Sequence, residues 1–149
     1  MSDPSIFTAI DLTGFQVVHG QFFKVDKLPY MNIFPREISF ARETHEMLHN
    51  CESIQILINE EGKTIVIKAA PSSEENSVRW VRNTKDTYIP RYTCPKLTAH
   101  IYTKWGWNSK YRYKTDGVLV HCDGKPVILF DFNKALAYPV NQIRNNNEQ

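Results

Sequence analysis

Two β-hairpin patterns, one in each half of the 149-residue chain, constrain the fold more than any other feature. In the first half, the runs Ile54–Ile58 and Thr64–Lys68 are rich in isoleucine and valine and flank a turn that contains glycine. In the second half, Gly117–Cys122 and Pro126–Phe132 flank an Asp-Gly turn. Two such runs joined by a short glycine-containing turn form an antiparallel hairpin.

A strand and a short helix are predicted before each hairpin. In the first half these are a strand at Glu37–Phe40 and a helix at Ala41–His49. In the second half they are a strand at Lys96–Ala99 and one or two helical turns at His100–Trp105, closed by Gly106. The sequence therefore predicts an α+β, β-hairpin-rich fold in which two β-α-β-β halves pack as one domain.

Changes in composition divide the chain into five segments. The N-terminal segment contains one predicted strand, at Phe15–His19, and the last residues are polar and predicted to be disordered. The predicted segments are an extended N-terminal part (1–36), the first half (37–70), a polar linker (71–78), the second half with a basic aromatic stretch (79–140) and the tail (141–149).

The composition of the chain predicts a cytoplasmic protein. No apolar run is long enough to cross a membrane, and the first residues lack the basic and apolar regions of a secretion signal. The three cysteines, Cys51, Cys94 and Cys122, form no C-x-x-C pair. We therefore expect reduced thiols and no membrane partner.

The charge of the chain is unevenly distributed, although the formal net charge is only +2. The stretch Arg79–Lys114 holds nine basic residues and one acidic residue, a local charge of +8, so the remainder of the chain carries −6. The same stretch holds eight aromatic residues. Cations interleaved with flat rings are typical of surfaces that bind nucleic acid.

The basic aromatic stretch supplies the predicted binding residues. The residues expected to contact phosphates are Arg91, Lys96, Lys104, Lys110, Arg112 and Lys114. The residues expected to stack on bases or to anchor the ligand are Trp105, Trp107 and Tyr111. Rings and cations alternate over residues 111–114, so a strand there would place its rings on one face and its cations on the other. The alternative is that the rings fill the core and the cations are simply solvated.

One motif suggests metal chemistry. His45–His49 reads H-E-x-x-H, in which two histidines one helical turn apart hold Zn²⁺ and Glu46 activates a water. A third ligand by type would be Glu60, Glu61, Asp86 or His100. The alternative is an ordinary packing helix.

Two other arrangements carry no predicted chemistry. The adjacent residues His121, Cys122 and Asp123 point to opposite faces of a strand and cannot form a triad among themselves. No phosphate-binding glycine motif occurs, and we predict no cofactor, no metal and no catalytic residue.

Two family resemblances extend these predictions. The first half, from Ile38–Phe40 through Lys68, resembles the swapped-hairpin unit of AbrB/MazE-type regulators, which are DNA-binding dimers. The whole chain resembles small uncharacterised proteins of Firmicutes mobile elements and prophages, loosely labelled integrase-related, through Tyr102–Asn108, Tyr111–Tyr113, Ile54–Asn59 and Leu129–Phe132. The first resemblance implies a homodimer, unless the internal repeat replaces it. The second implies a mobile-element setting.

The sequence thus predicts a non-enzymatic accessory or regulatory protein that binds DNA or RNA through the basic aromatic stretch. Two alternatives remain open. The chain could be an anti-CRISPR-like inhibitor that binds a host defence protein, or a small zinc-dependent hydrolase that uses His45, Glu46 and His49.

Overall fold

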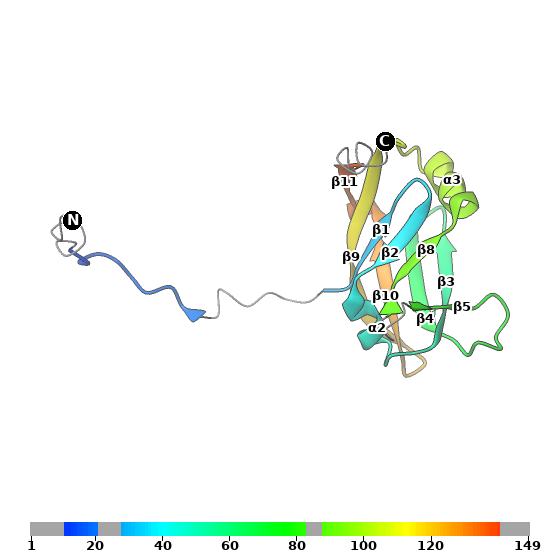
Figure 1. Ribbon diagram of the computed structural model, residues 1–149, viewed down its shortest axis with the longest axis horizontal. Coiled ribbons are helices and arrows are strands. Elements are labelled where there is room, and N and C mark those ends of the chain that lie inside the picture. The colour runs from blue at the N-terminus through cyan, green and yellow to red at the C-terminus, as the bar shows by residue number, and fades with distance from the viewer. Residues whose placement is uncertain (1–10, 21–27, 83–87, 141–149) are drawn as a thin grey trace, which may run out of the picture.

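Figure 1 shows the computed structural model of the protein, in which residues 11–20, 28–82 and 88–140 are described. The first half consists of β2 (Glu37–Phe40), α2 (Arg42–Met47), β3 (Ser53–Asn59) and β4 (Thr64–Ala69). The second half consists of β8 (Arg91–Thr93), α3 (Pro95–Lys104), β9 (Tyr111–Cys122) and β10 (Lys125–Asp131). The remaining elements are β1 (Tyr30–Ile33), β5 (Val78–Arg79), β6 (Val81–Arg82), β7 (Tyr88–Ile89), a 3-10 turn (Phe132–Lys134) and β11 (Leu136–Pro139).

The strands form one curled antiparallel sheet (Figure 1). The short pair β6–β7 is separate from it. Nine strands of the described part belong to the sheet, in the order β5-β3-β4-β10-β9-β1-β2-β8, and β11 pairs with β9. The first strands of the two halves, β2 and β8, pair with each other, as do the last strands, β4 and β10. The predicted α+β fold, with a β-α-β-β unit in each half, is confirmed.

The second half differs locally from its prediction. Lys96–Ala99 is not a strand but the beginning of α3, because Pro95 occupies the first helical turn, where its missing N–H costs no hydrogen bond. The strand before the helix lies earlier, at β8. Gly106 follows the helix with a φ of +66°, as its predicted role at the helix end requires.

The predicted strand at Phe15–His19 is not formed, since residues 11–20 contain no strand. Phe15 is 74% exposed and Val17 is 97% exposed, so neither side chain packs on the sheet. A strand in water needs an apolar surface to cover, and these exposed side chains cover none among the described residues. The predicted tail, 141–149, lies outside the described residues.

The predicted linker, 71–78, is attached to the sheet. Its last residue, Val78, is in β5 and pairs with Ile54 of β3, and the Gln55 side chain donates to the carbonyl of Glu75 over 2.9 Å. Trp80, two residues further on, is buried with 3% exposure. The second residue of the basic aromatic stretch, Trp80, therefore already belongs to the core.

The core lies on the inner face of the curled sheet and is capped by α2 at one end and α3 at the other (Figure 1). Its central residues come from strands of both halves. The fully buried aliphatic and aromatic residues include Ile33, Ile38, Ile54, Ile67, Ile128 and Phe130. The described helices include none that is long and apolar enough to span a membrane.

Gly117 lies where β9 passes closest to the core. A methyl group at this position would meet Ile128 Cγ2 and Phe130 Cε1 at 2.7 Å, and both of those side chains are fully buried. Contacts this short force the neighbours to move, so the residue must be glycine for steric reasons.

Gly117→Ala should lower the free energy of unfolding by about 1–3 kcal/mol, because the added methyl overpacks the core. Urea unfolding followed by circular dichroism measures the loss. Gly124→Asn is the matched control in the adjacent turn, where φ is +78° and the space is open. Asparagine tolerates this conformation. A control as unstable as Gly117→Ala would contradict the steric explanation.

The three cysteines differ in accessibility. Burial raises the pKa of the Cys51 thiol, whose sulfur accepts a hydrogen bond from Trp80 Nε1 over 3.3 Å. Burial also raises the pKa of Cys94. Cys122, near the end of β9, is exposed. No two of them form a disulfide.

Alkylation at about pH 8 should therefore modify Cys122 first. The raised pKa values of Cys51 and Cys94 leave less thiolate at this pH, and burial slows both reactions further. Iodoacetamide labelling followed by peptide mass spectrometry at successive times measures the order, with Cys122→Ser as the control that removes the fast phase. Equal rates at the three thiols would contradict the described burial.

Candidate nucleic-acid interface

The alternation of residues in β9 separates rings from cations. Ile33 pairs with Tyr113 and with Ile38, and Ile38 pairs with Tyr92, so these side chains form one row on the inner face. The next residue on each strand belongs to the outer face. The predicted cationic stripe therefore forms on the outer face, while Tyr113 packs inward.

The outer row runs across five strands. Following the pairing from β11 to β8, its members are Leu136, Lys114, Asn32, Ser39 and Arg91. Neighbouring strands are about 4.8 Å apart, so Lys114 and Arg91 are separated by about 14 Å across the sheet. Two predicted phosphate-binding residues that are distant in sequence thus share one row.

Arg112 is held in place on this face by three contacts. Its guanidinium donates to the buried Asn32 side chain, and it lies 4.6 Å from the centre of the Tyr138 ring and 5.8 Å from that of Phe34. Asn32 in turn lies 3.4 Å from the Ser39 hydroxyl. A guanidinium held by one hydrogen bond and two rings keeps further N–H donors for an anion.

Lys114 continues the same arrangement one step along β9. Its ammonium lies 4.3 Å from the centre of the Tyr30 ring, on the neighbouring strand. A shallow cleft beside Lys114 is also lined by Lys134, which follows β10, and by Tyr138 of β11. We define the outer face as the set of cations Lys110, Arg112, Lys114 and Lys134 with the rings Tyr30, Phe34 and Tyr138.

The two tryptophans predicted to stack on bases belong to the core, which corrects that prediction. Trp105 is 6% exposed, and its indole donates to the Glu60 carbonyl over 2.9 Å. Trp107 is half-buried and stacks on Tyr113 at 4.0 Å between ring centres. Both also pack against Phe132. Trp105 is therefore inaccessible to a base, and Trp107 has one face covered by Tyr113.

Tyr102 fixes α3 to this aromatic cluster. Its hydroxyl lies 2.9 Å from the Ile33 carbonyl and 2.6 Å from the Tyr111 carbonyl, so it can donate to either one. Burial, reinforced by the nearby Tyr113, raises the pKa of Tyr102 well above its usual range and keeps the hydroxyl protonated. The predicted stacking residue Tyr111 is exposed, but it shares the inner side of the strand with Tyr113, away from the outer face.

Two predicted phosphate-binding cations are in ion pairs. Arg91 Nε lies 3.1 Å from Glu37, and Lys104 Nζ lies 3.3 Å from Glu61. Lys104 is also at the far end of α3 beside the β3–β4 turn, so it is separate from the outer face. These carboxylates reduce the positive field that the sequence alone suggests.

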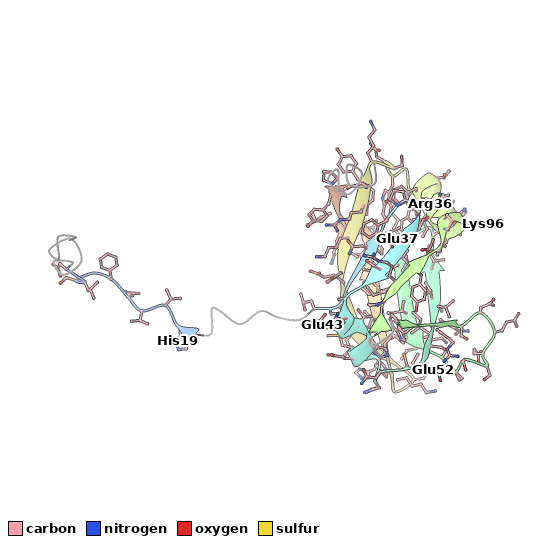
Figure 2. The ribbon with its side chains drawn as sticks, viewed as in Figure 1. His19, Arg36, Glu37, Glu43, Glu52 and Lys96 are labelled. Carbon is pink, nitrogen blue, oxygen red and sulfur yellow. The ribbon has the colours of Figure 1, made fainter. Side chains whose placement is uncertain are left out.

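Lys96 and Arg36 form a second basic site at the start of α3 (Figure 2). The Arg36 carbonyl accepts from the Cys94 N–H over 3.0 Å, which places it beside the first turn of the helix. Arg36 follows Phe34 in the β1–β2 turn, and Phe34 contacts Arg112. The turn therefore connects Lys96 with the outer face.

The sequence analysis missed several residues of the outer face. Tyr30, Phe34, Tyr138 and Lys134 lie outside the basic stretch, and strand pairing brings Tyr30 and Tyr138 to it. The alternation in residues 111–114 correctly identified Arg112 and Lys114 as one stripe. A search for aromatic residues in the flanking strands would have found Tyr30. Asn32, two residues further along the same strand, then falls on the same face.

The H-E-x-x-H motif does not take up the geometry that the alternative zinc site requires. Helix α2 ends at Met47, and His49 lies beyond it with a φ of +58°. His45 is buried and its Nε2 lies 2.9 Å from the Cys51 carbonyl, so this ring nitrogen is used inside the fold. Within residues 11–20, 28–82 and 88–140, no group of three metal-ligating side chains is present. Among the predicted third ligands, His100 pairs instead with Glu60 at 2.7 Å; Asp86 lies outside the described residues.

A larger cleft, of about 590 Å³, lies at the opposite end of the sheet. It is lined by the end of α2, the end of β4 and the β9–β10 turn, including Cys51 and Cys122. None of the predicted binding residues lines it.

Comparison with models of protein families, with curated proteins and with solved structures finds no match for this chain. The functional argument therefore depends on the geometry of the outer face.

Trp105→Ala should destabilise the protein by about 3–5 kcal/mol, since it removes a buried ring and leaves the Glu60 carbonyl without its donor. Tyr138→Ala, on the outer face, should cost less than about 1 kcal/mol. Thermal and urea unfolding of both variants measures the difference. If the two substitutions were equally mild, Trp105 would not be a core residue.

Proposed function

We propose that this protein is a non-enzymatic nucleic-acid-binding protein that contacts its ligand through the outer face. The observation that carries the proposal is the row of anchored cations and rings on β9 and its neighbours. Arg112 and Lys114 supply charge, and Tyr30, Phe34 and Tyr138 supply flat apolar surface beside it. Cations next to aromatic rings on an open sheet face suit phosphates next to bases.

The charge of the outer face and the fixed position of Arg112 both support nucleic-acid binding there. Among the described residues, no carboxylate is in an ion pair with Lys110, Arg112 or Lys114, whereas Asp131 lies close enough to Lys134 for that charge to help lower the pKa of its carboxyl. Arg112 is also held before any ligand arrives, so binding loses less side-chain entropy there. The role of an accessory protein on a mobile element, implied by the family resemblance, is part of the same proposal.

Lys110→Glu/Arg112→Glu should abolish most binding to labelled single- and double-stranded DNA. Two reversed charges remove two phosphate contacts, so the slope of log affinity against log salt should fall by about 2. Fluorescence anisotropy across a salt series measures both quantities. Arg112→Gln, which removes charge but keeps an amide donor toward Asn32, should weaken binding in the same direction without unfolding the protein.

The matched control is Lys68→Glu/Lys125→Glu, with the same change in net charge near the larger cleft. This variant should bind within about threefold of the parent protein, because phosphate contacts act locally under screening. An equal loss in both double variants would show only nonspecific attraction. An absence of binding at about 50 mM salt would overturn the proposal.

A protein partner is the second candidate, in line with the predicted inhibitor of a host defence protein. The observation that favours it is an aliphatic row on the outer side of the other half of the sheet. The pairing places Leu57, Val66, Leu129 and Val118 side by side, with Leu57 45% and Val118 59% exposed. Co-purification of a stoichiometric protein that is lost in Leu57→Lys/Val118→Lys would favour this candidate over nucleic acid.

A further inference from the structure

A cleft of about 280 Å³ opens on the outer face between β9 and the chain that follows β10. It is lined by Lys114, Thr115, Asp116, Lys134, Leu136 and Tyr138. One water takes about 30 Å³ of liquid volume, so the cleft has room for a flat ring system of the size of one nucleobase.

The lining combines the groups that an unpaired nucleotide needs. Leu136 is 63% exposed and Tyr138 is 36% exposed, so both offer apolar surface. The two lysines bring positive charge to the rim, where a phosphate would lie. Asp116 is exposed beside Tyr30, its partner in the strand register, and its carboxylate only accepts hydrogen bonds when ionised.

We infer that this cleft holds one unpaired base, so that the outer face selects single-stranded over double-stranded nucleic acid. The inference rests on the proposed function and names its ligand class. In a duplex the base faces are stacked on one another and cannot reach a cleft in a sheet. A base would first have to flip out, which costs a few kcal/mol. A single strand places its bases on aromatic and apolar side chains without that cost.

Asp116 further restricts which base fits. Cytosine and adenine carry an exocyclic amino group that donates to a carboxylate, whereas thymine has a carbonyl oxygen at that position and only its ring N3–H as a donor. A carboxylate facing a carbonyl oxygen repels it. Strands rich in cytosine and adenine should therefore bind more tightly than thymine strands of equal length.

The experiment compares three labelled probes at about 50 mM salt: a 12-nucleotide alternating dC-dA strand, a 12-nucleotide dT strand and a 12-base-pair duplex. The parent protein should bind the dC-dA strand about tenfold more tightly than the duplex and severalfold more tightly than the dT strand. Tyr138→Ala should lower the affinity for the single strands severalfold more than the affinity for the duplex, and so lose most of the preference for single strands.

Asp116→Asn is the isosteric control for base selection. An amide both donates and accepts, so this variant should bind the dT strand more tightly and bring the ratio of the two single strands to about one. The parent protein could bind duplex and single strands equally while Lys110→Glu/Arg112→Glu still loses binding to both. That result would overturn this inference and leave the proposed function standing. An absence of binding to all three probes would overturn both. An unchanged ratio in Asp116→Asn would overturn the role of the carboxylate.

Discussion

The fold depends on the pairing of one strand, β9, along both of its edges. Along one edge, the C-terminal part of β9 pairs with β10 and its N-terminal part pairs with β11. Along the other edge, β9 pairs with β1. Since β10 also pairs with β4, this strand joins the first hairpin to β1, β2 and β8. Gly117 lies at the junction and brings the β9 backbone against Phe130. Arg112 and Lys114 of the candidate interface take their positions from this strand, and Tyr30 and Tyr138 take theirs from strands paired with it.

Aromatic packing at the end of α3 explains why the basic stretch is only partly a surface. Trp105, Trp107, Tyr102, Tyr113 and Phe132 form a contiguous group of ring contacts that closes one end of the core. Burying such rings contributes more stabilisation than any surface contact in this region. The tryptophans therefore serve stability, and the smaller number of rings on the outer face is left for a ligand.

Ion pairs refine the electrostatic picture in the same way. The acidic residues that balance the chain are brought by the fold to particular cations, so Glu37 and Glu61 reduce the field of Arg91 and Lys104. On the outer face, Arg112 and Lys114 instead contact rings and an amide. A ring attracts a cation but leaves its formal charge uncompensated. Among the described side chains of the stretch, the cations outside ion pairs are Lys96 at the start of α3 and Lys110, Arg112 and Lys114 at the start of β9.

The sequence by itself determined the two hairpins, the β-α-β-β order and the alternation that separates Tyr113 from Arg112 and Lys114. Each of these follows from local periodicity and turn chemistry, which act between near neighbours in the chain. Only the tertiary structure decided that Trp105 is buried, that Arg91 has an acidic partner, that His49 lies beyond its helix and that Tyr30 and Tyr138 flank the cations. These outcomes depend on strand pairing and on competition for core volume between residues far apart in sequence, which no local pattern encodes.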